Sequence, residues 1–190
     1  HSATLLATIV PPQGLGSQKP VLVAGGKDAT GSPLGSLEVY DPASGTFVLD
    51  GNAMATPRFE HAAVLVADGS VLIAGGTSPP LNQPTNTAYV YTFSGFEAGN
   101  PPAGVASTLP AAMNLMTSAR TGLAVTRLST GEVLLTGGFV LAGGALQALQ
   151  SAELFDTGTG MFGPIETAGN GIAVLATQRG YHTSTALGAS

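Results

Sequence analysis

One pattern of sixteen residues returns along the chain and restricts the folds that it can adopt. It runs from His61 to Gly76 (HAAVLVADGSVLIAGG), where two apolar stretches flank an Asp-Gly pair and a Gly pair follows the second stretch. The same layout runs from Leu123 to Gly138 and, with a longer Pro/Gly-rich connection, from His1 to Gly26. A fourth copy begins at His182. A unit that returns at such spacing predicts a repeat architecture in which each unit packs against its neighbours.

Each repeat unit predicts four short antiparallel strands. Asp-Gly between two apolar stretches is a strong hairpin signal, and alternating apolar and polar residues are typical of half-buried strands. A Ser-Gly turn is expected to separate the last two strands of the middle unit. The strands are expected at 2–10, 21–24, 37–41 and 46–49, then at 62–67, 71–74, 88–92 and Phe96, with a third set between 123 and 162.

Charged residues are scarce, which limits the possible partners. Only 9% of the 190 residues are charged, the formal net charge is −5, and the six Lys and Arg residues form no basic run. Nucleic acid is therefore not expected as a partner, because binding it rests on clustered cations. No 18 consecutive apolar residues occur, so no transmembrane helix is expected. The chain has no Cys, which excludes disulfides and thiolate chemistry, and its Lys-poor, Ser/Thr/Gly-rich composition favours an exported, extracellular or cell-surface protein.

These repeated residues resemble the kelch repeat, the four-stranded blade of a β-propeller, in a divergent, bacterial-looking form. A Gly pair follows the second strand, an aromatic residue lies at the end of the third, Phe lies on the fourth, and Arg comes three positions before the first strand. A Glu recurs on the third strand of two units. The residues that carry the motif are Gly25, Gly26, Gly75, Gly76, Gly137, Gly138, Tyr40, Phe155, Phe47, Phe96, Phe162, Arg58, Arg120, Arg179, Glu38 and Glu153.

The resemblance implies an all-β fold, a partial β-propeller of four-stranded antiparallel blades that occupies residues 1–190 as one domain. Blade units are expected at about 1–57, 58–119 and 120–178, and residues 179–190 would form the first strand of a further blade. Since a closed ring takes about four to eight blades, we expect these residues to be about half of a six- or seven-bladed propeller. The remaining blades would come from the same parent chain, a cleaved partner or a second copy.

The repeated side chains have expected structural roles. Phe47, Phe96 and Phe162 are expected to fill the core between diverging sheets, because burial of an aromatic ring is strongly stabilising. The recurring Arg and Glu predict an ion pair within or between blades, since a buried guanidinium needs an acceptor for its rigid fork of donors. In the middle unit Tyr89 takes the Glu position, so that unit is expected to lack the pair. Strand alignment there favours Tyr91 as the partner of Phe96.

The three histidines, His1, His61 and His182, all lie at the entrance to a predicted first strand. A shared metal site is the minor interpretation, because equivalent atoms of separate blades lie beyond the ~2 Å of a metal–nitrogen bond. We expect each imidazole to bond the backbone of a neighbouring loop. The Asp residues lie singly in or beside turns, where Asp is favoured for backbone bonding, so no metal or cofactor is assigned.

Two functions from different classes follow. The first is a non-catalytic scaffold that binds protein or carbohydrate through the loops at 11–20, 27–36, 77–87, 97–119 and 139–151, which are rich in polar uncharged residues. The alternative, implied by the resemblance, is a fragment of a galactose oxidase-like copper radical oxidase. Such enzymes use a linked Cys and Tyr, and this chain has no Cys. Its catalytic residues would lie largely outside this segment, with Tyr181 and His182 as the nearest candidates. No catalytic residue is assigned.

Overall fold

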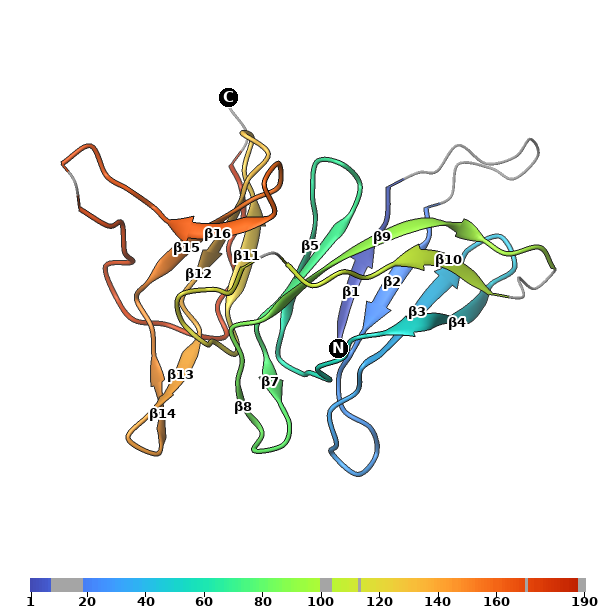
Figure 1. Ribbon diagram of the computed structural model, residues 1–190, viewed down its shortest axis with the longest axis horizontal. Helices are drawn as coiled ribbons and strands as arrows, with labels where there is room; N and C mark the ends of the chain where they lie inside the picture. The colour runs from blue at the N-terminus through green and yellow to red at the C-terminus, as the bar shows by residue number, and fades with distance from the viewer. Residues whose placement is uncertain (8–18, 100–103, 113, 170, 188–190) are drawn as a thin grey trace.

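The protein is built from β-strands, and a computed structural model describes residues 1–7, 19–99, 104–112, 114–169 and 171–187 (Figure 1). The described residues contain three four-stranded antiparallel sheets and no helix. The first sheet consists of β1 (Ser2–Leu5), β2 (Val21–Ala24), β3 (Ser36–Asp41) and β4 (Thr46–Ala53). The second consists of β5 (Ala62–Leu65), β6 (Val71–Ala74), β9 (Ala88–Phe96) and β10 (Val105–Thr108). The third consists of β11 (Ala124–Arg127), β12 (Val133–Thr136), β15 (Ala152–Asp156) and β16 (Met161–Pro164).

Each sheet is a meander whose strands pair in chain order, and none of the three closes on itself. The registers repeat as well. The first residue of the second strand lies opposite an aromatic residue of the third in every sheet, as Tyr40, Tyr91 and Phe155 show. Tyr91 is therefore the counterpart of Tyr40, while Tyr89 occupies the position of Glu38 and Glu153.

The sheets pack face to face through two apolar cores. One core joins the first sheet to the second, with Leu22 and Val39 against Ile73 and Tyr91. The other core joins the second sheet to the third through side chains that include Leu72, Ala74, Val133, Leu135 and Phe155. All four residues of β6 are buried, because this strand is covered on both faces. That explains why its sequence is apolar throughout and does not alternate.

Two hairpins occupy segments that the sequence analysis treated as loops. They are β7 (Thr77–Ser78) with β8 (Gln83–Pro84), and β13 (Phe139–Ala142) with β14 (Ala145–Ala148). Both hairpins and the loop over 27–35 project to the lower side of the molecule in Figure 1. One side of the stack is therefore formed by the connections that follow the Gly pairs.

The middle unit differs from its predicted layout. The predicted Ser-Gly turn before Phe96 is wrong, because β9 continues through Gly95 to Phe96 and the fourth strand is β10. Phe96 is half-buried at the margin of the core between the first two sheets and packs edge-on against Phe93, with ring centroids 5.2 Å apart. Gly95 pairs with a residue of β10 inside the ladder, so a glycine that looked like a turn residue lies within a strand.

Phe47, which was predicted to be a core residue, is not buried by any sheet of the described chain. Its side chain is 60% exposed, whereas Phe162, at the same place in the third sheet, is buried. Both rings pair with the aromatic residue across the ladder, Phe47 with Tyr40 at 5.1 Å and Phe162 with Phe155 at 4.8 Å between centroids. The difference arises because the third sheet covers Phe162 against the second sheet, while Phe47 lies on the face of the first sheet that points away from the second.

The strand predicted at 179–190 is not assigned to any ladder in its described part, residues 179–187. This segment instead lies along the third sheet, where Ser184 and Thr126 form a hydrogen bond between their hydroxyls and the Tyr181 amide donates to the Gly122 carbonyl over 2.7 Å. A strand requires a ladder partner, and these residues pair with none in the described ranges. The remaining residues, 188–190, lie outside the described part, as does most of the predicted first loop at 11–20.

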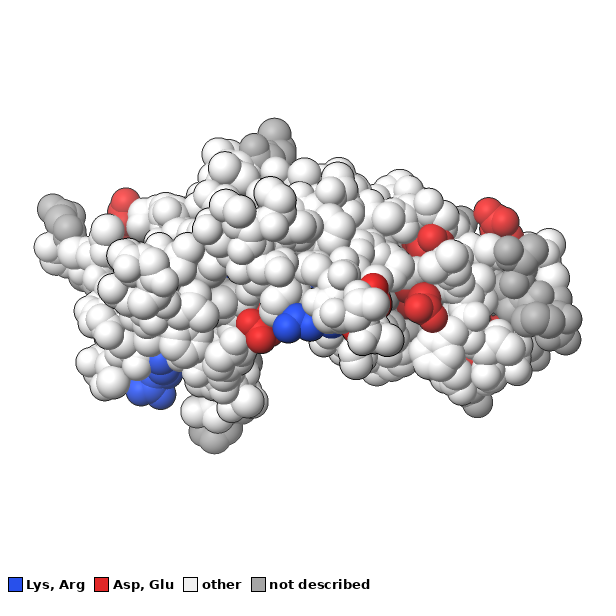
Figure 2. Space-filling view, turned by 90° about the horizontal axis from the view of Figure 1, so that it is seen from below, with Lys and Arg blue, Asp and Glu red and all other residues white. Residues whose placement is uncertain are grey.

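Charged side chains are few on the surface. Figure 2 shows one face that is mostly uncharged, on which the few acidic and basic groups include a red and a blue group side by side near the centre. Within the described ranges, no helix is long and apolar enough to span a membrane.

Candidate functional site

The junctions between consecutive sheets repeat the same main-chain contact. The amide of the second glycine of each pair donates to an Arg carbonyl at 2.8 Å: Gly26 to Arg58, Gly76 to Arg120, and Gly138 to Arg179. All six glycines of the pairs have positive φ. The backbone also approaches closely, since a Cβ on Gly75 would lie 2.5 Å from the Arg120 carbonyl oxygen. The three predicted Arg positions are therefore equivalent in their main-chain contacts.

Arg120 shows what the Arg side chain does at such a junction. Its main chain rests on the second sheet, while its fully buried guanidinium reaches into the third. One nitrogen donates to the carbonyls of Gly137 (2.9 Å) and Ser151 (3.3 Å), and the other donates to the Ser151 hydroxyl (3.1 Å) and to Glu153 (2.6 Å). The structure thus contains the ion pair expected from the recurring Arg and Glu. We name this set of two carbonyls, one hydroxyl and one carboxylate the guanidinium cradle.

Arg58 occupies the corresponding cradle of the second sheet. It donates to the carbonyls of Gly75 and Thr87, both at 2.9 Å, and to the Thr87 hydroxyl at 2.7 Å. Tyr89 replaces the carboxylate, as the sequence indicates, and its ring lies 4.9 Å from the guanidinium carbon. Burial lowers the pKa of Arg58 to about 10, so the group stays charged at neutral pH and the aromatic face supports a cation.

The first sheet has the same cradle residues. The Gly25 amide donates to the Ser36 carbonyl at 3.0 Å, just as Gly75 and Gly137 donate to Thr87 and Ser151 at 3.1 Å. Ser36 supplies the hydroxyl, and Glu38 lies two residues further on. Among the described residues no arginine donates to this set, and Glu38 is exposed.

Arg179 keeps the main-chain contacts of a junction, but its side chain lies in no cradle of the described residues. Its amide and carbonyl make the junction contacts, with Leu149 and Gly138, but its side chain is exposed and donates only to the Thr177 carbonyl, over 3.4 Å, among the described residues. Of the predicted motif residues, the structure therefore brings Arg120 and Glu153 together. It leaves Arg179 and Glu38 apart, at opposite ends of the stack.

His61 and His182 lie within hydrogen-bond distance of side-chain hydroxyls, and not of loop carbonyls as expected. The Nε2 atom of His61 lies 2.9 Å from the Ser2 hydroxyl, and Nε2 of His182 lies 2.9 Å from the Thr136 hydroxyl. Both rings press against the first glycine of a pair, Gly25 and Gly137 respectively. No group of three or more His, Cys, Asp or Glu side chains suited to hold a metal occurs in the described part of the chain.

Lowering the pH is expected to weaken the junction at His61. Burial, with Arg58 nearby, lowers the pKa of His61 from its ordinary 6.5 to about 3, so the folded protein holds this imidazole neutral. The unfolded chain binds the proton below pH 6.5, and stability therefore falls as pH decreases from 6.5 towards 3. Because the ring is only half-buried, we expect the loss in unfolding free energy between pH 7 and pH 5 to be about 1–2 kcal/mol.

Urea unfolding of the wild type and of His61→Leu at both pH values measures this effect. Leucine suits the position, since Leu123 occupies it in the next unit. The variant should lose most of the pH dependence, and equal slopes for the two proteins would show that another group carries it.

A buried polar network between the first two sheets escaped the sequence analysis. Four Asp residues bond turn amides as expected, namely Asp28, Asp41, Asp68 and Asp156. Asp50 also accepts from a nearby amide, that of Asn52 at 2.8 Å, but it lies on β4, and its carboxylate accepts in addition from the Tyr91 hydroxyl (2.9 Å) and from Ser107 (2.5 Å) of the second sheet. Burial and the Asp50 charge raise the pKa of Tyr91. No local signal marks this contact, because it joins residues more than forty positions apart.

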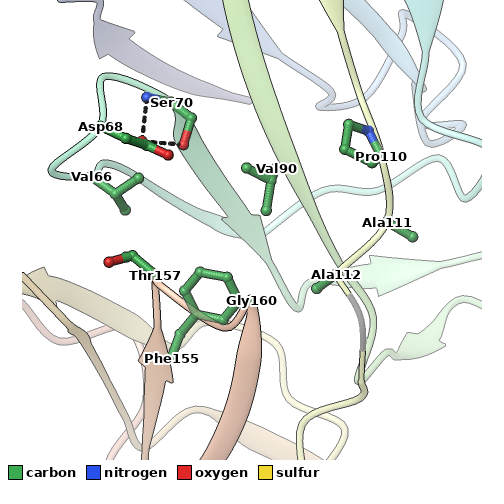
Figure 3. Close-up of a pocket in the computed structure, with 10 residues that line it drawn as sticks. All are labelled: Val66, Asp68, Ser70, Val90, Pro110, Ala111, Ala112, Phe155, Thr157 and Gly160. Atoms are coloured by element: carbon green, nitrogen blue, oxygen red, sulfur yellow. Dashed lines mark hydrogen bonds between the residues drawn. The ribbon is translucent and has the colours of Figure 1, made fainter.

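A pocket of about 250 Å³ lies between the second and third sheets (Figure 3). Its lining is mostly apolar, with Val66 and Val90 on one side and the Phe155 ring on the other. Asp68 is the one charged residue among the ten that line it, and its carboxylate already accepts from the Ser70 amide and hydroxyl. The pocket therefore offers van der Waals contact and no free acid or base.

Tyr181 and His182, the candidates of the oxidase alternative, are engaged in structural contacts. The Tyr181 hydroxyl donates to Glu60 over 2.7 Å, and partial desolvation together with this contact raises the pKa of the largely exposed Tyr181 to about 12. Its ring lies 5.2 Å from that of Phe139. A scan against protein-family models and a search of curated proteins found no match for this sequence.

Proposed function

We propose that this chain is a non-catalytic, exported scaffold of the kelch-type β-propeller, which binds protein or carbohydrate through its loops and is completed by further sheets. The observation that carries the proposal is the open face of the first sheet, the face that points away from the second. Phe47 and Leu49 on this face are 60% and 65% exposed, while Phe162, the counterpart of Phe47 in the third sheet, is buried between sheets. An exposed apolar patch of this kind marks a surface that another polypeptide covers.

The surface proposed to bind ligands is the side that carries the hairpins β7–β8 and β13–β14 and the loop over 27–35 (Figure 1). These connections differ in length and sequence, whereas the sheets repeat. Their polar residues are mainly uncharged, such as Asn82, Gln83 and Gln147. Amide and hydroxyl groups suit the hydroxyls of sugars or an uncharged protein surface, and a glycan array is the direct screen.

Completion by further sheets is tested by the mass and shape of the particle in solution. We expect sedimentation to give a species larger than the 18.8 kDa chain, and electron microscopy of that species to show a closed ring. A monodisperse wild-type monomer, or copper-dependent oxidase turnover by the assembled particle, would contradict the proposal.

Removing the apolar groups of the open face is expected to abolish association. Phe47→Ser combined with Leu49→Ser should give a folded monomer, because both side chains already lie in water and surface changes usually alter stability by about 0.5 kcal/mol or less. Leu146→Ser is the matched control, since Leu146 is similarly exposed but lies on the hairpin side. Association that survives the double change would show that the open face is not the contact surface.

A further inference from the structure

The two junctions between sheets differ at one pair of positions. In the first junction, Asp50 accepts a hydrogen bond from the Tyr91 hydroxyl over 2.9 Å, and both side chains are buried. In the second junction Phe155 has the register of Tyr91. Ala112 corresponds to Asp50, because the residue before each of them pairs with the same position of the third strand. The second junction therefore lacks the carboxylate and the hydroxyl together, and Ala112 and Phe155 both line the pocket of about 250 Å³.

Two further positions in the wall of this pocket also carry smaller side chains. Val66 is the counterpart of Leu6, because the amide of each residue closes the connection that follows a first strand. Thr157 lies two residues after the aromatic residue of its third strand, where the second sheet has Phe93 packed against the core of the first junction. All four positions thus differ in the direction that opens space. Since protein interiors rarely leave voids larger than a water molecule, this combination indicates a formed pocket.

The chemistry of the wall limits what the pocket can hold. Val66 and Phe155 are each 2% exposed, and they face Val90 across the pocket (Figure 3). Asp68 is exposed, and its Oδ1 atom is held by the Ser70 amide at 2.9 Å and the Ser70 hydroxyl at 2.7 Å. A fixed carboxylate beside an apolar pocket, in a chain of net charge −5, repels anions.

We propose that this pocket binds a small, uncharged aromatic molecule of one or two rings. An apolar cavity of about 150 Å³ holds benzene. The 250 Å³ of this pocket therefore has room for a fused two-ring molecule such as indole. The Phe155 ring offers an offset or edge-on partner to a bound ring, while Val66 and Val90 contact its remaining surface. Water gains few hydrogen bonds within such a wall, so an apolar ligand displaces no strongly bound solvent.

The pocket is separate from the surface proposed to bind protein or carbohydrate. The turns β5–β6 and β15–β16 contribute Asp68, Ser70, Thr157 and Gly160 to its lining. The antiparallel ladders place both turns at the strand ends remote from the Gly pairs, and hence remote from the hairpins β7–β8 and β13–β14. Both walls belong to complete sheets of this chain, so the site does not depend on completion by further sheets.

Indole is the direct probe of the pocket. The chain has no Trp, so the emission of bound indole can be followed without interference from tryptophan. A fluorescence titration should show one site per chain, and indole should raise the Tm because it binds the folded state. Indole-3-carboxylate should bind about tenfold more weakly or worse, because its charge lies near Asp68. Asp68→Asn should remove that difference, since the amide oxygen can keep the bonds to Ser70.

Filling the pocket tests its location. Val66→Leu with Thr157→Phe introduces the larger side chains of the first junction and should weaken indole binding about tenfold or more. Ala112→Asp with Phe155→Tyr introduces the polar pair of the first junction and should have the same effect, so two independent variants are available. Thr159→Phe, at an exposed position of the same β15–β16 turn outside the pocket wall, is the matched control and should leave the affinity unchanged. Circular dichroism and urea unfolding check that each variant is folded.

The alternatives give different results. Absence of indole binding, or binding that the folded filled variants retain, overturns the proposal. Filled variants that are more stable than a wild type without affinity for indole would show that the space is only a packing void. Equal affinities for indole and indole-3-carboxylate overturn the preference for an uncharged ligand. A Gly-Trp-Gly peptide that binds more tightly than free indole would make a polypeptide side chain the occupant and overturn the small-molecule assignment. These results leave the proposed ring and loop surface to their own tests.

Discussion

Replacing Arg120 by leucine is expected to lower the unfolding free energy by about 3–5 kcal/mol, because the change leaves a buried charge without its partner. The guanidinium is fully buried and bonds two carbonyls, one hydroxyl and the Glu153 carboxylate. Glu153 keeps only the Thr117 amide as a donor among the described residues. Urea unfolding followed by circular dichroism measures the loss.

A double variant separates the ion pair from the backbone contacts. Arg120→Leu with Glu153→Leu removes the stranded carboxylate and should recover part of the stability, since apolar replacement of a buried pair is often nearly neutral. The Gly137 and Ser151 carbonyls still lose a donor, so recovery should be incomplete. Arg127→Leu, at an exposed position, is the control. A loss below about 1 kcal/mol for Arg120→Leu would place the pair in the range of surface salt bridges and contradict its structural role.

The second large effect is expected at Gly75. Alanine there adopts a positive φ of 66°, which costs roughly 1–2 kcal/mol, and its Cβ meets the Arg120 carbonyl oxygen at 2.5 Å. The clash adds about 1–3 kcal/mol, the range for overpacking of a well-packed site. We expect Gly75→Ala to lower the unfolding free energy by about 2–5 kcal/mol in total.

Gly45 provides the matched control for this prediction. Its φ is +72°, but a Cβ there meets no atom within 4 Å. Gly45→Ala therefore reports the backbone cost alone, about 1–2 kcal/mol, and the difference between the two variants measures the close approach of the sheets. Equal losses would show that the junction tolerates a methyl group and that the Gly pairs serve conformation only.

The strands were the most predictable part of the fold. The segments 21–24 and 71–74 were expected to the residue, because an apolar run bounded by turn residues and a Gly pair leaves little choice of boundary. The fourth strand of the middle unit, β10, was not expected at its observed place. A Ser-Gly pair is a turn signal by itself, and only the long-range ladder with β10 keeps the Ser-Gly pair of β9 extended. Local patterns identify strands but do not show which distant strand completes a ladder.

The candidate site was partly predictable from the repeat. The constant offset between Arg and Glu indicated the pair of Arg120 and Glu153, because repeated units repeat their contacts. The exposure of Phe47 within this chain could not be predicted, since a repeat predicts the role of a side chain but does not state whether a sheet of the same chain covers it. The bond between Asp50 and Tyr91 joins two sheets without a repeat, so no pattern marks it.

The connection that follows each Gly pair begins and ends at the same main-chain hydrogen bond. The carbonyl of the second glycine accepts an amide from the returning chain in all three sheets: Gly26 from Leu34, Gly76 from Thr85 and Gly138 from Leu149. Between these closures the chain varies in length and sequence while the sheets below keep their register. Each connection thus has the same main-chain attachment to its sheet, so one connection can be exchanged for another of different length without changing the strand register of the sheet that carries it.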